Sequence, residues 1–172
     1  MSRVARWLVA LGLVLLPSRA MAQLGNITAE TTVLQPLQVS GIWSLEFGTV
    51  PRNRVTTIAP TNIFSGAFSV TGQTGAQIAI SFTLPTTLVR VGGTQTMPIN
   101  TYTGCVAATY PVGTNPCTTF TPSAAPTNAT LVGGVRWFYI GARVDTRGLN
   151  AAQLPNGSYR SFIVMTAAYT GN

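Results

Sequence analysis

Residues 76–84 read AQIAISFTL, with apolar side chains at every second position. A period of two indicates a β-strand that buries one face. Residues 68–71 (FSVT) alternate in the same way, and the turn-forming sequence GQTG at 72–75 separates the two runs. Two alternating runs joined by a short glycine-containing turn are typical of a hairpin. The sequence therefore predicts a β-hairpin over residues 67–84.

Further extended runs recur along the chain, and no stretch after residue 22 has the periodicity of a helix. We expect strands at 27–33, 43–48, 55–58, 135–144 and 159–169. The run 135–144 places Phe138 and Ile140 on one face, whereas the closing run 159–169 is apolar on both faces. Many short strands without helices predict an all-β fold, an immunoglobulin-like Greek-key β-sandwich. A single sheet closed on itself is the alternative.

The composition restricts the classes of function. The chain has ten Lys+Arg, all of them arginine, three Asp+Glu and no histidine. The absence of histidine excludes Ser-His-Asp and Cys-His catalysis and a histidine-ligated metal. Three carboxylates offer little for paired acid–base chemistry. We therefore expect a protein that is not an enzyme, with no catalytic residue, no metal and no cofactor.

The first 22 residues have the layout of a cleavable signal peptide. Arg3 and Arg6 precede the apolar run 7–16, and Ala20-Met21-Ala22 supplies a small-x-small cleavage site. A membrane span needs about 20 apolar residues, which this run does not reach. We expect residues 23–172 to form one domain without a transmembrane segment. Its location would be the periplasm, the cell surface or the extracellular space of a Gram-negative bacterium.

The seven arginines of residues 23–172 are scattered singly along the sequence. A nucleic-acid surface needs clustered cations, so no nucleic-acid partner is expected. The preferred interpretation is dispersed solubilising charge. A weakly positive surface that attracts anionic polysaccharide or lipid head groups is the alternative.

The two cysteines, Cys105 and Cys117, are separated by eleven residues. In an exported protein such an isolated pair indicates a structural disulfide, and closing so short a loop contributes about 3 kcal/mol. The pair lies in a stretch rich in Thr, Pro, Ala and Gly at about 104–134. We expect this stretch to be a stapled surface loop, and such loops often carry recognition.

Five segments together resemble a family of secreted bacterial proteins known as domain of unknown function 4402. The segments are QPLQV at 35–39, LEFGTV at 45–50, FSVTG at 68–72, FYIGA at 138–142 and GSYRSFIV at 157–164, the last followed by Tyr169. The resemblance implies a secreted β-sandwich and carries no enzymatic activity. The chain departs from the family pattern at Ala142 and Ser161, where glycine is usual.

The closing run 159–169 also resembles the last strand of chaperone–usher pilins. In pilins the sandwich lacks a strand, and the N-terminal extension of a neighbouring subunit fills the groove. The candidate strand-exchange segment here carries Ile27, Ala29, Thr31 and Val33 on one face. The resemblance implies other copies or related surface subunits as partners, and a periplasmic chaperone. From the sequence alone, the preferred interpretation of residues 27–39 is that they form this domain's own first strand, and donor exchange is the alternative.

The expected function is that of a secreted, non-enzymatic structural or adhesive subunit of the cell surface, pilin-like and polymerising by strand exchange. The alternative is a monomeric extracellular module that binds carbohydrate or another ligand. Its candidate binding surface is Trp137 and Tyr139, which share one face of the run 135–144, together with the 104–134 stretch. Packing of both rings in the core is an equally weighted interpretation.

Overall fold

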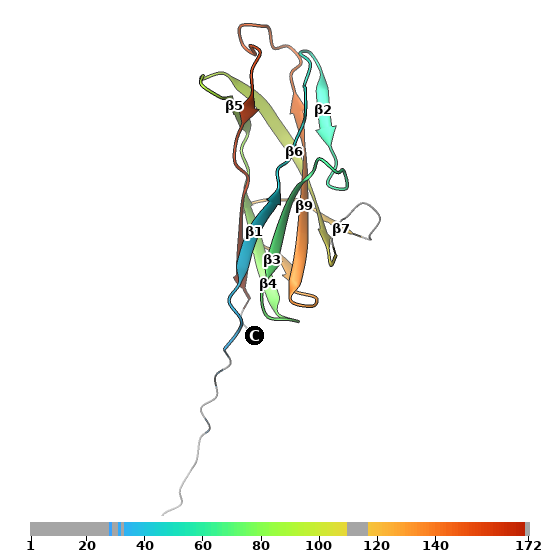
Figure 1. Ribbon diagram of the computed structural model, residues 1–172, viewed down its shortest axis with the longest axis vertical. Coiled ribbons are helices and arrows are strands. Elements are labelled where there is room, and N and C mark those ends of the chain that lie inside the picture. Colours follow the sequence, from blue (N-terminus) through green and yellow to red (C-terminus); the bar gives the residue numbers. More distant parts are fainter. Residues whose placement is uncertain (1–27, 29–30, 32, 110–116, 171–172) are drawn as a thin grey trace, which may run out of the picture. The chain divides into compact units, whose positions relative to one another are not determined.

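Every regular element among the described residues is a β-strand, which confirms the all-β prediction (Figure 1). The structure is a computed structural model that describes residues 28, 31, 33–109 and 117–170, so the expected leader lies outside it. The strands are β1 (Gln38–Trp43), β2 (Val55–Ile58), β3 (Gly66–Thr71), β4 (Gln77–Thr83), β5 (Thr87–Arg90), β6 (Thr96–Ala107), β7 (Thr118–Phe120), β8 (Thr127–Thr130), β9 (Val135–Asp145), β10 (Tyr159–Arg160) and β11 (Val164–Tyr169). They pair antiparallel in two sheets.

The larger sheet is built around β9 and β6, which pair with each other. Two strands share the other edge of β9 in succession, β3 opposite residues 135–140 and β2 opposite residues 142–145. Along β6, β7 pairs with residues 104–106 and β5 with residues 96–98. In the view of Figure 1 the lower half of this sheet is therefore β1-β3-β9-β6-β7, and the upper half is β2-β9-β6-β5-β10.

The smaller sheet, β11-β4-β8, contributes the other layer of the main core. The predicted inner face of residues 76–84 is buried there, as is that of β9. The fully buried members of this core are Val70, Ile78, Ile80, Phe82, Leu131, Phe138, Ile140 and Met165. The ring of Phe120 links the two layers, because its centroid lies 5.8 Å from that of Phe82 and 6.2 Å from that of Phe138.

The upper half has a core of its own that is covered differently. Its buried residues are Met97, Ile99, Ala142, Val144 and Leu154. Leu45, Phe47 and Val50 from the irregular residues 44–50 pack on them, and so do Leu149 from the stretch after β9 and Tyr159 from β10. Loops therefore take the place of a second sheet at this end.

The predicted hairpin over 67–84 is wrong, because β3 and β4 lie in different sheets. The connection between them crosses from one layer to the other. Its backbone is held by the β8–β9 connection, since the Gly72 N–H donates to Gly134 O (3.0 Å) and the Gly75 N–H to Leu131 O (2.8 Å). The alternation requires only that the apolar face of each strand is turned toward the core. Two strands in opposite layers meet this requirement as well as two strands that are hydrogen-bonded in one sheet.

Three other expected elements differ from the structure. A strand was expected at 43–48, but the strand in this region, β1, covers residues 38–43. Residues 44–50 are irregular. The closing run is divided by residues 161–163 into β10, which pairs with β5, and β11, which pairs with β4. The stretch 104–134 is not one long loop, because it holds the end of β6, all of β7 and all of β8. Short strands rich in Thr and Ala resemble loops in composition.

No helix in the described part of the chain is long and apolar enough to cross a membrane.

Candidate functional site

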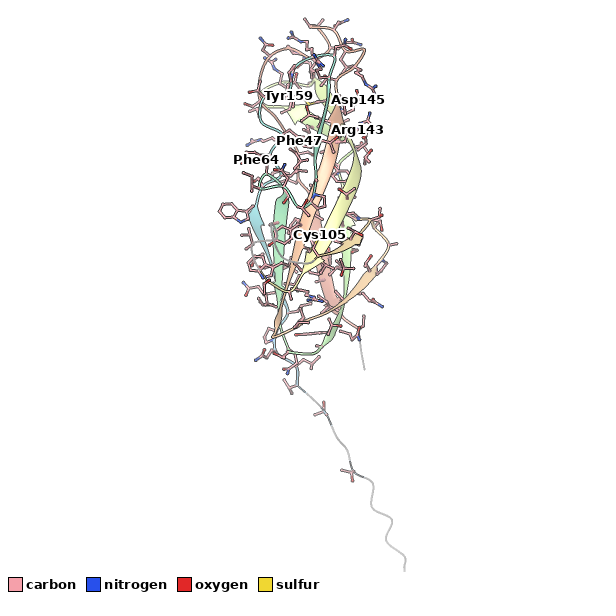
Figure 2. The ribbon with its side chains drawn as sticks, turned by 90° about the vertical axis from the view of Figure 1, so that its right-hand side faces the viewer. Phe47, Phe64, Cys105, Arg143, Asp145 and Tyr159 are labelled. Carbon is pink, nitrogen blue, oxygen red and sulfur yellow. A yellow bond between two sulfur atoms is a disulfide. The ribbon has the colours of Figure 1, made fainter. Side chains whose placement is uncertain are left out.

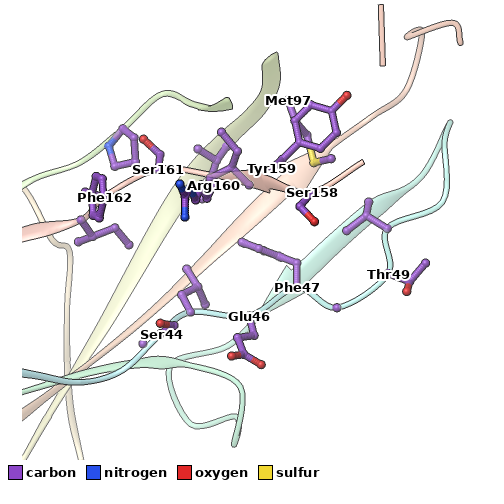
Figure 3. A pocket seen from close by; sticks show the side chains of 18 of the residues that line it. Ser44, Glu46, Phe47, Thr49, Met97, Ser158, Tyr159, Arg160, Ser161 and Phe162 are labelled. Atoms are coloured by element: carbon purple, nitrogen blue, oxygen red, sulfur yellow. The ribbon is translucent and has the colours of Figure 1, made fainter. Parts of the chain in front are cut away.

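The candidate site is a cleft of about 940 Å³ on the side of the upper half (Figure 3). One flank is residues 41–50, which continue from β1 toward β2. The other flank is residues 154–163, which include β10 and lead into β11. Figure 3 shows the first flank, from Ser44 to Thr49, facing the second, from Ser158 to Phe162.

The floor of the cleft is the apolar core itself. Ile140 from β9 and Ile99 from β6 line it, and both are buried. Met97 and the half-buried Phe68 extend this floor. Core side chains of the central strands are thus reached directly through the cleft, which indicates an apolar ligand or segment as its occupant.

Large apolar side chains also stand on the rim of the cleft. Trp43 is 58% exposed on one flank, and Phe162 is 81% exposed on the other. Val164, the first residue of β11, is half exposed beside Phe162. Exposed aromatic side chains at the edge of an apolar floor are typical of an interaction surface.

The stretches of the two flanks that face each other lie largely outside the β-ladders. Residues 44–50 belong to no strand, and within this stretch the Glu46 N–H donates to Phe64 O (2.9 Å). Residues 161–163 likewise belong to no strand. An extended segment lying between them would therefore meet backbone groups that a ladder can use.

The ionisable side chains that line the cleft are Glu46, Arg52, Tyr159 and Arg160. In the described ranges there is no group of three or more His, Cys, Asp or Glu side chains that could hold a metal ion. Glu46 is the acid on the rim. At the upper end of the cleft the Arg52 guanidinium donates to Leu154 O (2.8 Å) and to Asn156 Oδ1 (2.8 Å), so it fixes the second flank.

Asp145, at the end of β9, is held in its charged form by arginines. The Arg147 guanidinium donates to both of its carboxylate oxygens, and Arg143 donates to Oδ2 at 2.8 Å. The hydrogen bonds from Arg147 lower the pKa of this carboxyl far below its ordinary value, with a smaller contribution from Arg143. A carboxylate so strongly paired is a poor proton acceptor.

The predicted disulfide is confirmed, and it lies close to the candidate binding surface. Cys105 in β6 is bonded to Cys117 just before β7 (Figure 2 labels Cys105). Tyr139, 3% exposed, belongs to the same small cluster as the buried Cys105, and the half-buried Trp137 packs against that cluster. Tyr139 therefore offers almost no surface to a sugar ring, and a stacking platform would depend on Trp137.

The candidate strand-exchange segment lies mostly outside the described residues, which include Thr31 and Val33 but neither Ile27 nor Ala29. Both described residues are exposed and belong to no strand, and Val33 is 89% exposed. The next residues are tied down, since the Tyr169 hydroxyl donates to Gln35 O (2.7 Å). The residues before Gln35 thus begin at the end of the sandwich that is opposite the cleft.

Sequence reasoning missed the cleft. The run 43–48 was expected to be a strand and the closing run 159–169 to be apolar on both faces, so Trp43 and Phe162 were not identified as rim residues. One signal was available in the sequence, because the closing run is apolar on both faces. In the structure the face of β11 that carries Val164 is exposed, so an apolar face is left uncovered there.

No family model, no curated protein and no solved structure matches this chain.

Proposed function

We propose that this chain is an exported, non-enzymatic structural subunit of the bacterial cell surface, which polymerises when its cleft accepts an extended segment of a neighbouring copy. The observation that carries the proposal is the cleft, whose floor is formed by buried core side chains and whose two flanks lie largely outside the ladders. The resemblances to domain of unknown function 4402 and to pilins support it. On this proposal the sandwich is an incomplete immunoglobulin-like Greek-key fold.

A β-strand fits the cleft better than a small ligand does. The floor is apolar, and the long flanks carry polar and apolar residues along their length, whereas small-molecule sites place a few converging polar groups in a compact pocket. A strand would supply an apolar side chain at every second position toward the floor and backbone groups toward the flanks. It would also give the upper half the second layer that loops now provide.

The proposed donor is the segment that contains Ile27, Ala29, Thr31 and Val33. Its alternation gives one face directed at the floor and a polar face, Thr28 to Thr32, directed outward. Because it is attached at the end of the sandwich opposite the cleft, the contact between copies is head-to-tail. Contacts of this kind produce open filaments when the rotation between copies does not close a ring.

A periplasmic chaperone belongs to the same proposal. Before assembly the rim exposes Trp43 and Phe162, and such a patch promotes aggregation. A partner that covers the cleft during export would prevent this.

The test compares two neighbouring substitutions in the proposed donor of the mature protein. Ile27→Asp places a carboxylate on the face directed at the floor, and Thr28→Asp places the same charge on the outward face. Light scattering and unheated gels should show ordered oligomers for the wild type and for Thr28→Asp. They should show monomers for Ile27→Asp and for deletion of residues 23–33.

A wild-type protein that stays monomeric at all concentrations would contradict the proposal, and so would equal effects of Ile27→Asp and Thr28→Asp. Neither substitution touches a described strand, so unfolding of the monomer does not confuse the result.

A further inference from the structure

The arginines are scattered along the sequence, but the fold gathers them at one end. Of the seven in the described residues, only Arg136 lies elsewhere, at the lower end of β9. The other six form what we call the cationic end: Arg52, Arg54, Arg90, Arg143, Arg147 and Arg160. Figure 2 shows this end through its labelled residues Arg143, Asp145 and Tyr159, well above Cys105.

One part of the cationic end is organised by Asn156. Arg52 donates to Asn156 Oδ1 (2.8 Å), and Arg90 donates to the backbone O of the same residue (3.1 Å). β10 pairs with β5 and places Tyr159 opposite Arg90, so Arg160, which is opposite Val89, extends from the other face of this pair and lines the cleft. Two guanidinium groups, those of Arg52 and Arg90, therefore meet around one loop.

The other part is organised by Thr146. Its N–H donates to Arg54 O (2.9 Å), which joins the chain before β2 to the end of β9. Asp145, next to Thr146, forms salt bridges with Arg143 (2.8 Å) and Arg147 (2.6 Å). Arg52 and Arg54 are two residues apart, so the chain before β2 connects the two parts at this end of the larger sheet.

The charges of this surface are largely uncompensated. Asp145 is the one acid in it, and among the described residues Arg52, Arg54, Arg90 and Arg160 form no salt bridge. The other described acid, Glu46, lies on the cleft rim and forms none with them. Like charges brought together repel, so the fold gains nothing from their proximity unless an anion binds there.

We propose that the cationic end binds an acidic polysaccharide, a sugar chain carrying carboxylate or sulfate groups. The guanidinium group is planar and pairs with such oxoanions through two parallel hydrogen bonds. Hydrogen bonds to Asn156 and Leu154 already restrict Arg52 and Arg90, so less side-chain entropy is lost on binding. Six cations across several loops match a repeated charge better than a single small anion. This inference does not depend on strand exchange.

An anionic membrane is the less suitable partner. Binding at a bilayer surface usually combines cations with inserted aromatic or leucine side chains. The exposed aromatic residues in the described ranges, Trp43, Phe64 and Phe162, lie beside the cleft, where only Arg52 and Arg160 of the cationic end are also found. The partly exposed apolar side chains near the arginines are valines, at positions 55, 89 and 91.

The experiment measures binding of the mature protein to immobilised dextran sulfate and polygalacturonate, with neutral dextran as the reference polymer. Arg160→Gln and Arg54→Gln remove charges whose side chains form no hydrogen bond or salt bridge in the described structure. Arg136→Gln removes the same charge at the other end. Arg160 also lines the cleft, so thermal melting and light scattering check the fold and the assembly state of every variant, and binding is compared between variants in the same state.

We expect the wild type to bind both anionic polymers at low salt and to be released at high salt, because salt screens exposed charges. The double variant Arg54→Gln/Arg160→Gln should bind about fivefold more weakly, which corresponds to two exposed ionic contacts. Arg136→Gln should bind like the wild type.

Three results would overturn the proposal. The first is no binding of the wild type to either anionic polymer at low salt. The second is an equal loss from Arg160→Gln and Arg136→Gln, which would mean a response to net charge alone. The third is binding to phosphatidylglycerol vesicles without binding to the polymers, which would assign the surface to lipid. If the double variant does not fold, the two single variants are compared with Arg136→Gln in the same way.

Discussion

Phe162 should matter little for the folded subunit and strongly for its assembly. Its side chain is 81% exposed on the rim of the cleft. With about 200 Å² for a phenylalanine, roughly 160 Å² is free to be covered by a donor strand. If a donor strand covers half of this area, Phe162→Ala should make the free energy of assembly less favourable by about 2 kcal/mol. This corresponds to about a thirtyfold rise in the dissociation constant.

Ile63 provides the matched control. It is 88% exposed, it is apolar, and it does not line the cleft. Ile63→Ala and Phe162→Ala should each leave the free energy of unfolding in urea within about 0.5 kcal/mol of the wild type, because exposed side chains contribute little to the monomer. Sedimentation of a dilution series should show weaker assembly for Phe162→Ala alone.

The reasoning is refuted by either of two results. Phe162→Ala that assembles like the wild type would show that the rim is not covered in the polymer. Equal weakening by Ile63→Ala and Phe162→Ala would indicate nonspecific hydrophobic association and not occupation of the cleft.

Three further predictions concern the body that carries the cleft. Replacing Cys105 and Cys117 with alanine should lower the free energy of unfolding by about 3 kcal/mol, since the disulfide closes a loop with a sequence separation of 12, and a loss under about 1 kcal/mol in urea would contradict this. Gly141→Ala should lower the free energy of unfolding by at least about 2 kcal/mol in thermal melting, because a Cβ at this position would lie 2.7 Å from Pro60 N in the chain after β2. Gly41→Ala is the control and should be tolerated, because the atom nearest to its Cβ would be 3.9 Å away. Because the pKa of Asp145 is lowered in the folded protein, its carboxylate stabilises the fold above about pH 4 and loses this effect on acidification. The difference in melting temperature between the wild type and Asp145→Asn should therefore shrink between about pH 5 and pH 2. A difference that stays constant over this range would exclude the linkage.

Alternation in the sequence predicted the buried faces well. Ile78, Ile80 and Phe82 are buried as their period of two requires, and so are Phe138 and Ile140. The same pattern could not identify the pairing partners. β3 and β4 are joined by a short turn yet lie in different layers, because alternation fixes only which side chains face the core and leaves the direction of the backbone ladder open.

The cleft and the cationic end could not be predicted, for a common reason. The flanks of the cleft are more than 100 residues apart in the sequence, and each is an irregular stretch without a local signal. The arginines meet because β2, β5, β10 and the end of β9 converge at one end of the larger sheet. Both features depend on the order of the strands, which the periodicity of the sequence does not contain.

The edges of the two sheets give an independent argument for strand exchange. Exposed edge strands of natural sheets are usually short or carry a charged residue or a proline, because an unprotected edge pairs with strands of other chains. β10 has two residues and carries Arg160, β7 has three, and β2 and β8 have four each. β1 and β11 are six residues long, have no charged residue or proline, and run next to each other on the side where the cleft opens. The side that lacks protection is therefore the side on which a donor strand would lie, as expected if its edges are covered by another copy in the assembled protein.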